Sequence, residues 1–426
     1  MPDGTVPVAV GLLINGIATY VFLVVARRAL GDDSYGGLAV LWGLVYILGP
    51  GFFQPLEQEL ARATAARAAR GQGSAPVLRE ATRVGAIGFA VVALGLVVAW
   101  PLGLDHLLDD RVSLLVAMIV ALGTFAAAEL VRGIMSGRHK FALYGRYFAV
   151  EGLGRVGAAL VLAVVGVEIV GPYALAIGFA FALAVVVVLA GEKPFVQPGP
   201  ESSMRELTPA LGLLLATSLS EAFLLNVGPV AMKVLSDDEA APGVLLNGLI
   251  IARTPLFFFQ AVKAALLPNL ASLAGHGDLH GFRDLQLRLV AAVTAVAGLA
   301  VVAMAALGPW LVEFLFGDTI GSLDMALLAA GSGGLMVLLS LSLGLVALNH
   351  TRLAVIGFVV AVAVFPLALP LADDPFLRVE LALVAAVTAG SLVTGWLLRH
   401  EYAQHIAAGR LTSRASAAGD TSPGGR

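Results

Sequence analysis

The sequence contains no cysteine and few charged residues. Without cysteine, disulfides and thiolate metal ligands are excluded. Only 13% of the 426 residues are Asp, Glu, Lys or Arg, whereas soluble proteins carry about 25%. Hydrophobic residues make up 59% of the chain, and its mean hydropathy is +0.91. Because a water-soluble fold could not cover so much apolar surface, the composition predicts a polytopic membrane protein.

Several functional motifs are also missing. The chain has no G-x-x-x-x-G-K-S/T phosphate loop, which excludes ATP hydrolysis by that chemistry. It has no H-E-x-x-H and no other metal-ligand spacing, so we expect neither a cofactor nor a metal site. The net charge of −3 is too small to indicate a nucleic-acid partner.

Long apolar runs fill the sequence instead. A window of about 19 residues finds twelve runs, each long enough to cross a bilayer and unbroken rather than alternating, which predicts helices. The predicted spans are 6–26, 36–56, 84–104, 112–134, 143–166, 169–190, 207–233, 243–267, 288–316, 324–348, 353–372 and 377–398.

The two halves of this pattern repeat each other. Leu30-Gly-Asp-Asp follows the first span and Leu235-Ser-Asp-Asp the seventh, while GPGFFQ (49–54) matches TPLFFFQ (254–260). Each half holds an even number of spans, so the copies point the same way across the membrane. Chance similarity between apolar segments is the alternative. The pattern predicts an all-α polytopic membrane protein with twelve transmembrane helices in two six-helix bundles, 1–190 and 207–400, related by a parallel repeat.

Three polar segments complete the predicted organisation. Residues 57–73 are alanine-rich with three arginines, which is typical of a basic helix on the headgroup surface. Residues 191–206 contain three prolines and mixed charge, which indicates a cytoplasmic linker between the bundles. Residues 401–426 are small and polar, and we expect a disordered cytoplasmic tail.

The distribution of basic residues predicts the orientation. Nineteen Lys and Arg fall in the loops after even-numbered spans and in the tail, and five fall in the other loops. The positive-inside rule then places both termini in the cytoplasm. Arg27 and Arg28, after the first span, point the other way, but the total outweighs them. The acidic pairs beginning at Asp32, Asp109, Asp237 and Asp373 then lie outside, away from nucleotide sugars, which argues against a glycosyltransferase and against any enzyme.

Two long segments resemble a known family. These are LGDDSYGGLAVLWGLVYILGPGFFQPLEQELARATAARAARG, from residue 30, and VLSDDEAAPGVLLNGLIIARTPLFFFQAVKAALLPNLASLAGHGD, from residue 234. Together with 137–155, they resemble polysaccharide-biosynthesis flippases of the multidrug/oligosaccharidyl-lipid/polysaccharide (MOP) exporter superfamily, which includes O-antigen and lipid II flippases. The resemblance covers roughly 1–400.

This resemblance implies a function. It implies a V-shaped pair of bundles in a bacterial-type cytoplasmic (inner) membrane that moves a polyprenyl-linked saccharide from the inner to the outer leaflet by alternating access. The implied partners are a lipid-linked saccharide with a phosphate or pyrophosphate head, membrane lipids, and glycosyltransferases or a polymerase of the same pathway. It carries over no binding residue, because such residues vary within the family.

Charges inside the spans are the candidate site residues, because an ionisable group in the bilayer costs about 3 kcal/mol or more. Arg253 lies in the eighth span, with Gln260 two turns further on and Lys263 near the predicted cytoplasmic mouth. A cationic stripe of this kind would bind phosphate. The alternative for Arg253 is a structural ion pair with a neighbouring carboxylate, for which Glu221 is a candidate.

Other polar residues in the spans have two interpretations each. Glu57 and Lys263 occupy matching positions in the repeat and would pair as a gate, or extend separately to water. Glu151 and Arg155 are four residues apart and would neutralise each other, or bind a sugar or cation. The complete set of candidates is as follows. The candidate substrate-binding residues are Arg253, Gln260, Lys263, Glu151, Arg155 and Asn226, and the candidate ion-coupling residue is Glu221.

Three functions follow from the sequence. The first is a lipid-linked saccharide flippase. The second is an ion-coupled multidrug exporter of the same superfamily, which would use acidic groups such as Glu151 and Glu221. The third is a non-transporting membrane scaffold for polysaccharide assembly.

Pro50 and Pro255 match in the repeat, and we expect paired bends there.

Overall fold

The structure is a computed structural model, all-helical in the part of the chain that it describes. It describes the backbone of all residues except 1–4, 192–195, 203–205, 208–210 and 420–426, and the side chains of these except 5, 33, 257, 260–265, 268 and 407–419. Eleven helical segments among them are long and apolar enough to cross a membrane. The protein is therefore an all-α polytopic membrane protein.

The helices of the first half begin with a very long one. Helix α1, Thr5–Ala69, contains two spans, Val6–Asp32 and Ser34–Ala69, joined at Gly31. Gly31 has φ 70°, a conformation that glycine adopts without steric cost. The other helices are α2 (Ala75–Ala99), η1 (Trp100–Leu102), α3 (Leu104–Leu107), α4 (Val112–Gly137), α5 (Phe141–Val165) and α6 (Val170–Ala190).

The second half contains one helix more than the six predicted spans, because one predicted span is divided into two helices. Its elements are α7 (Leu211–Leu235), α8 (Ala241–Ala252), α9 (Thr254–Gly275), α10 (Leu279–Phe316), α11 (Ser322–Ala347), α12 (Thr351–Ala368), η3 (Leu369–Leu371) and α13 (Pro375–Gly419). Helix α8 is apolar but shorter than a span. The predicted continuous span 243–267 is thus corrected to two helices that meet at Arg253.

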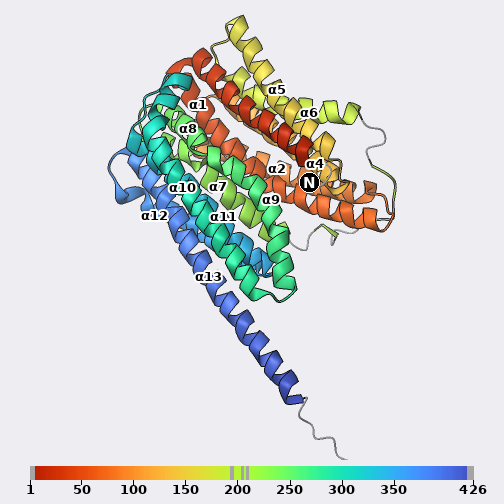
Figure 1. The fold of residues 1–426 in the computed structure, drawn as a ribbon. Coiled ribbons are helices and arrows are strands. Elements are labelled where there is room, and N and C mark those ends of the chain that lie inside the picture. The colour runs from red at the N-terminus through yellow and green to blue at the C-terminus, as the bar shows by residue number, and fades with distance from the viewer. Residues whose placement is uncertain (1–4, 192–195, 203–205, 208–210, 420–426) are drawn as a thin grey trace, which may run out of the picture.

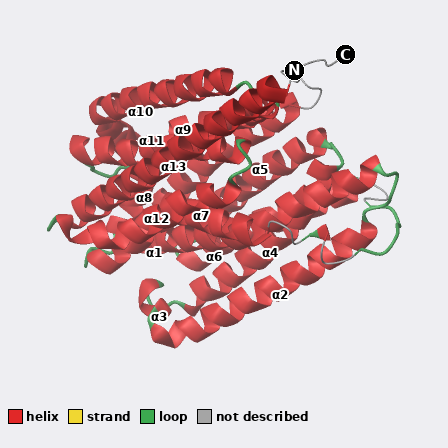
Figure 2. Cartoon of the chain, turned by 90° about the horizontal axis from the view of Figure 1, so that it is seen from below, coloured by secondary structure: helices red, strands yellow, loops and turns green. Residues whose placement is uncertain are grey.

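The helices pack as two groups, seen in Figure 1 as red to yellow and green to blue. Helix α1 packs on α2, α4, α5 and α6, while α11 packs on α9, α10 and α13. Figure 2 shows the helices of both groups running roughly side by side. The groups meet mainly where α1 lies on α7 and α8.

Close approach of backbones makes this contact between the groups. A Cβ on Gly36 would overlap the carbonyl oxygen of Glu239, and a Cβ on Gly43 would lie 2.8 Å from the carbonyl oxygen of Asn226. Both glycines are on the span Ser34–Ala69, seven residues and so about two turns apart on one face. Small residues at such positions let membrane helices approach each other closely.

Two of the predicted polar segments are helical. Residues 57–69 do not form a separate surface helix; they continue α1, and Arg67 on them is only 1% exposed. Residues 401–419, expected to be disordered, continue α13, which extends well beyond its neighbours in Figure 1. Residues 420–426 lie outside the described part. Alanine and arginine favour helices. The composition of 57–73 therefore indicates a helix, but it does not show whether that helix is separate or continues α1. In the same way, the small polar residues of 401–419 do not distinguish a disordered tail from a helix.

The linker between the halves is fixed by Arg67. Its guanidinium donates to both carboxylate oxygens of Glu206, at 2.9 and 3.2 Å, and to the carbonyl oxygens of Gly73, Pro200 and Glu201. These bonds use the whole donor fork of one buried arginine. The described part of the predicted linker 191–206 therefore packs on the end of α1.

Replacing Arg67 should loosen this junction. Hydrogen bonds to charged groups contribute about 1.5–3 kcal/mol net, and the Glu206 side chain is one-third exposed, so we expect Arg67→Ala to lower stability by about 2–3 kcal/mol. Thermal unfolding in detergent measures this. Arg79→Ala, at an exposed position on α2, is the matched control and should change little; equal effects of the two would contradict the role of Arg67.

The same junction should respond to acid. The hydrogen bonds from Arg67 lower the pKa of Glu206. A carboxylate with a lowered pKa in the folded state stabilises the fold at pH above its ordinary pKa of about 4.5, and this contribution is lost as pH falls through the lowered pKa. The stability difference between wild type and Arg67→Ala should therefore shrink below about pH 4. A difference that is constant from pH 7 to pH 3 would contradict this expectation.

Candidate functional site

The break between α8 and α9 is the central feature of the site. Pro255 lacks the N–H that would bond to the carbonyl of Ile251, four residues earlier. The hydroxyl of Thr254 donates to that carbonyl instead, at 2.8 Å. The neighbouring carbonyl, of Ile250, accepts from the Tyr20 hydroxyl at 2.9 Å. Since Tyr20 belongs to the first helix group, the second group's broken helix is completed by a residue of the first.

Arg253 occupies the break itself. It ends α8 and precedes α9, and it is 9% exposed. Among the described side chains, no carboxylate forms an ion pair with its guanidinium, and no side chain forms a hydrogen bond with it. Tyr20 is near enough to interact with it electrostatically. Glu221 on α7 is half-buried and is not its partner. The side chains of Gln260 and Lys263 lie outside the described residues, so their place in a cationic stripe stays a prediction.

Glu151 and Arg155 lie inside the first group in a hydrogen-bonded network, in which Arg155 Nε is a buried donor without a partner among the described residues. Arg155 Nη1 donates to the Tyr46 hydroxyl, and Nη2 donates to Asn15 Oδ1 and to the Thr19 hydroxyl, all at 2.8–2.9 Å. Glu151 is 3.8 Å from Arg155 and accepts from the Asn15 amide. The predicted pair is thus part of a larger network that joins α5 to both spans of α1.

A second buried network in the same group joins α1, α4 and α5. Arg132 donates to Glu57 from Nε at 3.0 Å and from Nη2 at 2.5 Å, and Nη2 also donates to Glu129 at 3.0 Å. The Tyr144 hydroxyl donates to the second oxygen of Glu57 at 2.7 Å. Glu57, predicted to form a gate with Lys263, therefore has its described partners within its own helix group.

Asn226 is placed between the groups rather than in an open site. Its amide nitrogen donates to the carbonyl of Tyr46 at 3.2 Å. That carbonyl is four residues before Pro50, so it too has lost its helical partner. Of the two prolines at which we expect paired bends, Pro255 lies beside a break in its helix, whereas α1 stays helical through Pro50. Asn226 and Tyr20, 206 positions apart, thus perform the same task, each on the other group's helix.

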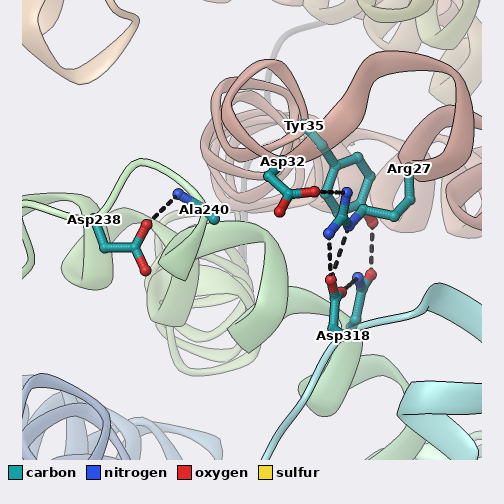
Figure 3. A network of polar contacts seen from close by, with 7 residues as sticks. Arg27, Asp32, Tyr35, Asp238, Ala240 and Asp318 are labelled. Carbon is teal, nitrogen blue, oxygen red and sulfur yellow. Dashed lines mark hydrogen bonds and ion pairs between the residues drawn. The ribbon is translucent and has the colours of Figure 1, made fainter.

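The same reciprocity holds at the end of the spans. Arg27 donates from two nitrogens to Asp318, and Figure 3 shows this pair beside Asp32 and Tyr35. Lys233, also 206 positions after Arg27, pairs with Asp109 of the first group at 2.5 Å. Each basic residue therefore reaches an acid on the opposite group. We name the two pairs the rim latch.

Buried polar contacts complete the rim latch around Asp318. Its other oxygen accepts from Asn247 of α8 at 2.7 Å, and Asn247 accepts from the Tyr35 hydroxyl at 2.6 Å. The Arg27 guanidinium lies 5.7 Å from the centre of the Tyr35 ring. Sequence reasoning missed these residues because the partners are 71 to 291 positions apart. The one signal was that Arg27 and Lys233 lie on the side with few basic residues.

Comparison with known proteins gives the fold its class. The structure is similar over 93% of its length to 98% of a multidrug resistance MATE family transporter of the MOP superfamily in an inward-facing conformation, with TM-score 0.70 and 12% identity. A MATE transporter of Vibrio cholerae gives TM-score 0.64, 16% identity, and coverage of 92% and 95% of the two chains. An outward-facing MATE structure gives 0.62 at 12% identity, covering 94% and 95%. The chain therefore has the fold of these MATE transporter structures.

The similar proteins found by sequence have no described activity. An uncharacterized protein of Mycobacterium bovis and one of Mycobacterium tuberculosis are each 25% identical over 337 residues, which cover 74% of this chain and 73% of theirs. No protein-family model matches the chain.

The rim latch should be measurable by spin labelling, because the absence of native cysteine makes introduced cysteines unique. We expect Asp318→Asn combined with Lys233→Ala to lengthen or broaden the distance between labels at exposed positions 110 and 237. Asp373→Asn, an exposed acid outside the latch, should leave the distance unchanged. An unchanged distance in the double variant would show that the latch does not hold the groups together.

Proposed function

We propose that this protein is a flippase that moves a polyprenyl-phosphate-linked saccharide from the inner to the outer leaflet. The observation that carries the proposal is Arg253, a buried cation at a helix break with no carboxylate partner among the described side chains. Arginine pairs with phosphate through two parallel hydrogen bonds. The amino end of α9 adds the partial positive charge of a helix dipole at the same point.

In this proposal α8 and α9 together make the twelfth crossing. Transporters of this type bind substrate near the bilayer midplane, where discontinuous helices meet at the interface of their repeats. The reciprocal contacts of Tyr20 with Asn226, and of Arg27 with Lys233, support two six-helix bundles related by a parallel repeat. Both termini are then cytoplasmic, in a bacterial-type inner membrane.

The rim latch lies on the side that the basic residues predict to be outside. A closed outer side supports an inward-facing state, in which the phosphate head enters from the inner leaflet. The higher TM-score with an inward-facing MATE structure is consistent with this. Opening of the latch and rocking of the bundles would then release the head outward, while the lipid tail stays in the bilayer.

The charge of the substrate helps to drive this direction. A cell interior is electrically negative, so moving one negative charge outward through 100 mV releases about 2.3 kcal/mol. A pyrophosphate head would gain more than a monophosphate. Glu221 remains a candidate for coupling to an ion, and glycosyltransferases or a polymerase of the same pathway remain candidate partners.

A multidrug exporter is the second candidate, because the similar solved structures are described as multidrug resistance transporters. An exporter of cations would depend on acidic groups rather than on Arg253. In the described structure Glu151 is already engaged by Asn15, and Glu221 is the remaining candidate.

Reconstitution separates these functions. In vesicles that contain a fluorescent polyprenyl-pyrophosphate saccharide, Arg253→Ala should lower the flipping rate at least tenfold. Arg253→Lys should keep part of it, because lysine retains the charge without the bidentate geometry. Arg28→Ala, an exposed arginine, is the control.

Each other result has a defined meaning. Intact flipping in Arg253→Ala overturns the phosphate site. Loss of drug efflux in Glu221→Gln, with Arg253 dispensable, supports the exporter. Wild-type protein that moves neither substrate supports the scaffold.

A further inference from the structure

Three potential metal ligands meet at the end of the second helix group that carries the extension of α13. His350 directly precedes α12, and Glu401 and His405 lie on α13. One ligand atom from each lies within 4.8 Å of the other two. Glu401 and His405 are four residues apart, so they share one face of the helix. No sequence motif indicates this cluster, because His350 is far from the other two residues along the chain.

The distances fit a small tetrahedral metal. His350 Nε2 lies 3.2 Å from Glu401 Oε2. Zinc bonds of about 2.0–2.1 Å place two tetrahedral ligands about 3.3 Å apart, so this pair already has the required separation. His350 and Glu401 side chains are 34% and 13% exposed, which leaves a route for an ion to enter.

The orientation of His405 is the second, independent observation. Its Nδ1 lies 2.9 Å from the carbonyl oxygen of Glu401. A carbonyl only accepts, so Nδ1 carries the proton and Nε2 presents its lone pair. Metal-binding histidines are generally held in this way, with the other ring nitrogen donating to a carbonyl or carboxylate. An ion pair between His350 and Glu401 alone would not require His405 to lie there.

We propose that His350, Glu401 and His405 bind a divalent transition metal of the zinc class, with the fourth position open to water. Two imidazoles and one carboxylate are a common three-ligand set for zinc. One carboxylate and two imidazoles favour this class over soft monovalent copper. This site does not depend on the flippase proposal.

Metal binding would tie two elements together. It would join the start of α12 to the extension of α13, next to a cavity of about 750 Å³ lined by residues that include Gln286, Leu398 and Tyr402. The bound ion would hold the extension of α13 against the edge of this cavity. We therefore expect the metal to increase stability as well as to bind.

The experiment uses full-length protein in detergent, stripped of metal and without a polyhistidine tag. It carries His106→Ala, because Asp105, His106 and Asp110 form an exposed cluster that would add a weak second site. Calorimetric titration with zinc should give one site per chain with low-micromolar affinity, and cobalt should give visible absorption bands of tetrahedral coordination. Zinc should also raise the thermal midpoint.

Variants assign the site. His405→Ala and Glu401→Gln should each weaken zinc binding at least tenfold and abolish the zinc-dependent rise in midpoint, with unchanged midpoints in chelator as evidence of folding. His400→Ala is the control, since His400 is exposed on the same helix and stacks on Trp396. Absence of zinc binding, or binding that neither variant weakens, overturns the proposal.

Discussion

The requirement that every backbone carbonyl within a membrane be satisfied by the protein governs this structure. Two prolines, Pro50 and Pro255, free carbonyls in helices that face each other across the contact between the groups. Asn226 donates to the carbonyl of Tyr46, which Pro50 frees. Tyr20 donates to the carbonyl of Ile250, next to the Ile251 carbonyl that Pro255 frees and that Thr254 satisfies within its own group. Each group therefore contacts a carbonyl at a helix defect of the other, and the contact between the groups is specified by hydrogen bonds as well as by packing.

The same requirement applied to charges distinguishes Arg253 from the other buried arginines. Arg155 and Arg132 are each surrounded by acceptors on neighbouring helices, and both also lie near aromatic rings. Removing a partner from such a network leaves a buried charge uncompensated, which costs several kcal/mol. Arg253 is buried to a similar degree without such acceptors in the described structure. In the proposed function, an anionic ligand would pair with this buried cation at the helix break.

Much of this fold follows from the sequence, because hydropathy and length alone locate spans such as 112–134 and 169–190. The choice of Arg253 as a candidate site residue also follows, because the free-energy cost of a charge in the membrane depends on its position within the span. The break beside it does not, because Pro50 and Pro255 both lack a backbone donor and only Pro255 lies beside a division of its helix. The structural role of Arg67 was equally hidden, because it depends on linker carbonyls more than a hundred residues away.

In the proposed transport cycle, the rim latch would make the contact between the groups specific and still allow its release. Its charges are largely withdrawn from solvent in this structure: the side chains of Arg27 and Lys233 are 11% and 15% exposed, and Asp318 is 1% exposed. Water would solvate these groups again on opening, so the net cost is far below the Coulomb energy of the closed pairs. Two charge-assisted contacts of about 1.5–3 kcal/mol each give a closed state that is a few kcal/mol deep. A ligand shifts such an equilibrium only by its difference in affinity for the two states, and about 5.5 kcal/mol is enough to invert it almost completely. A phosphate that binds Arg253 more tightly in one state has interactions of that size available, so a latch of this strength is compatible with control by the substrate.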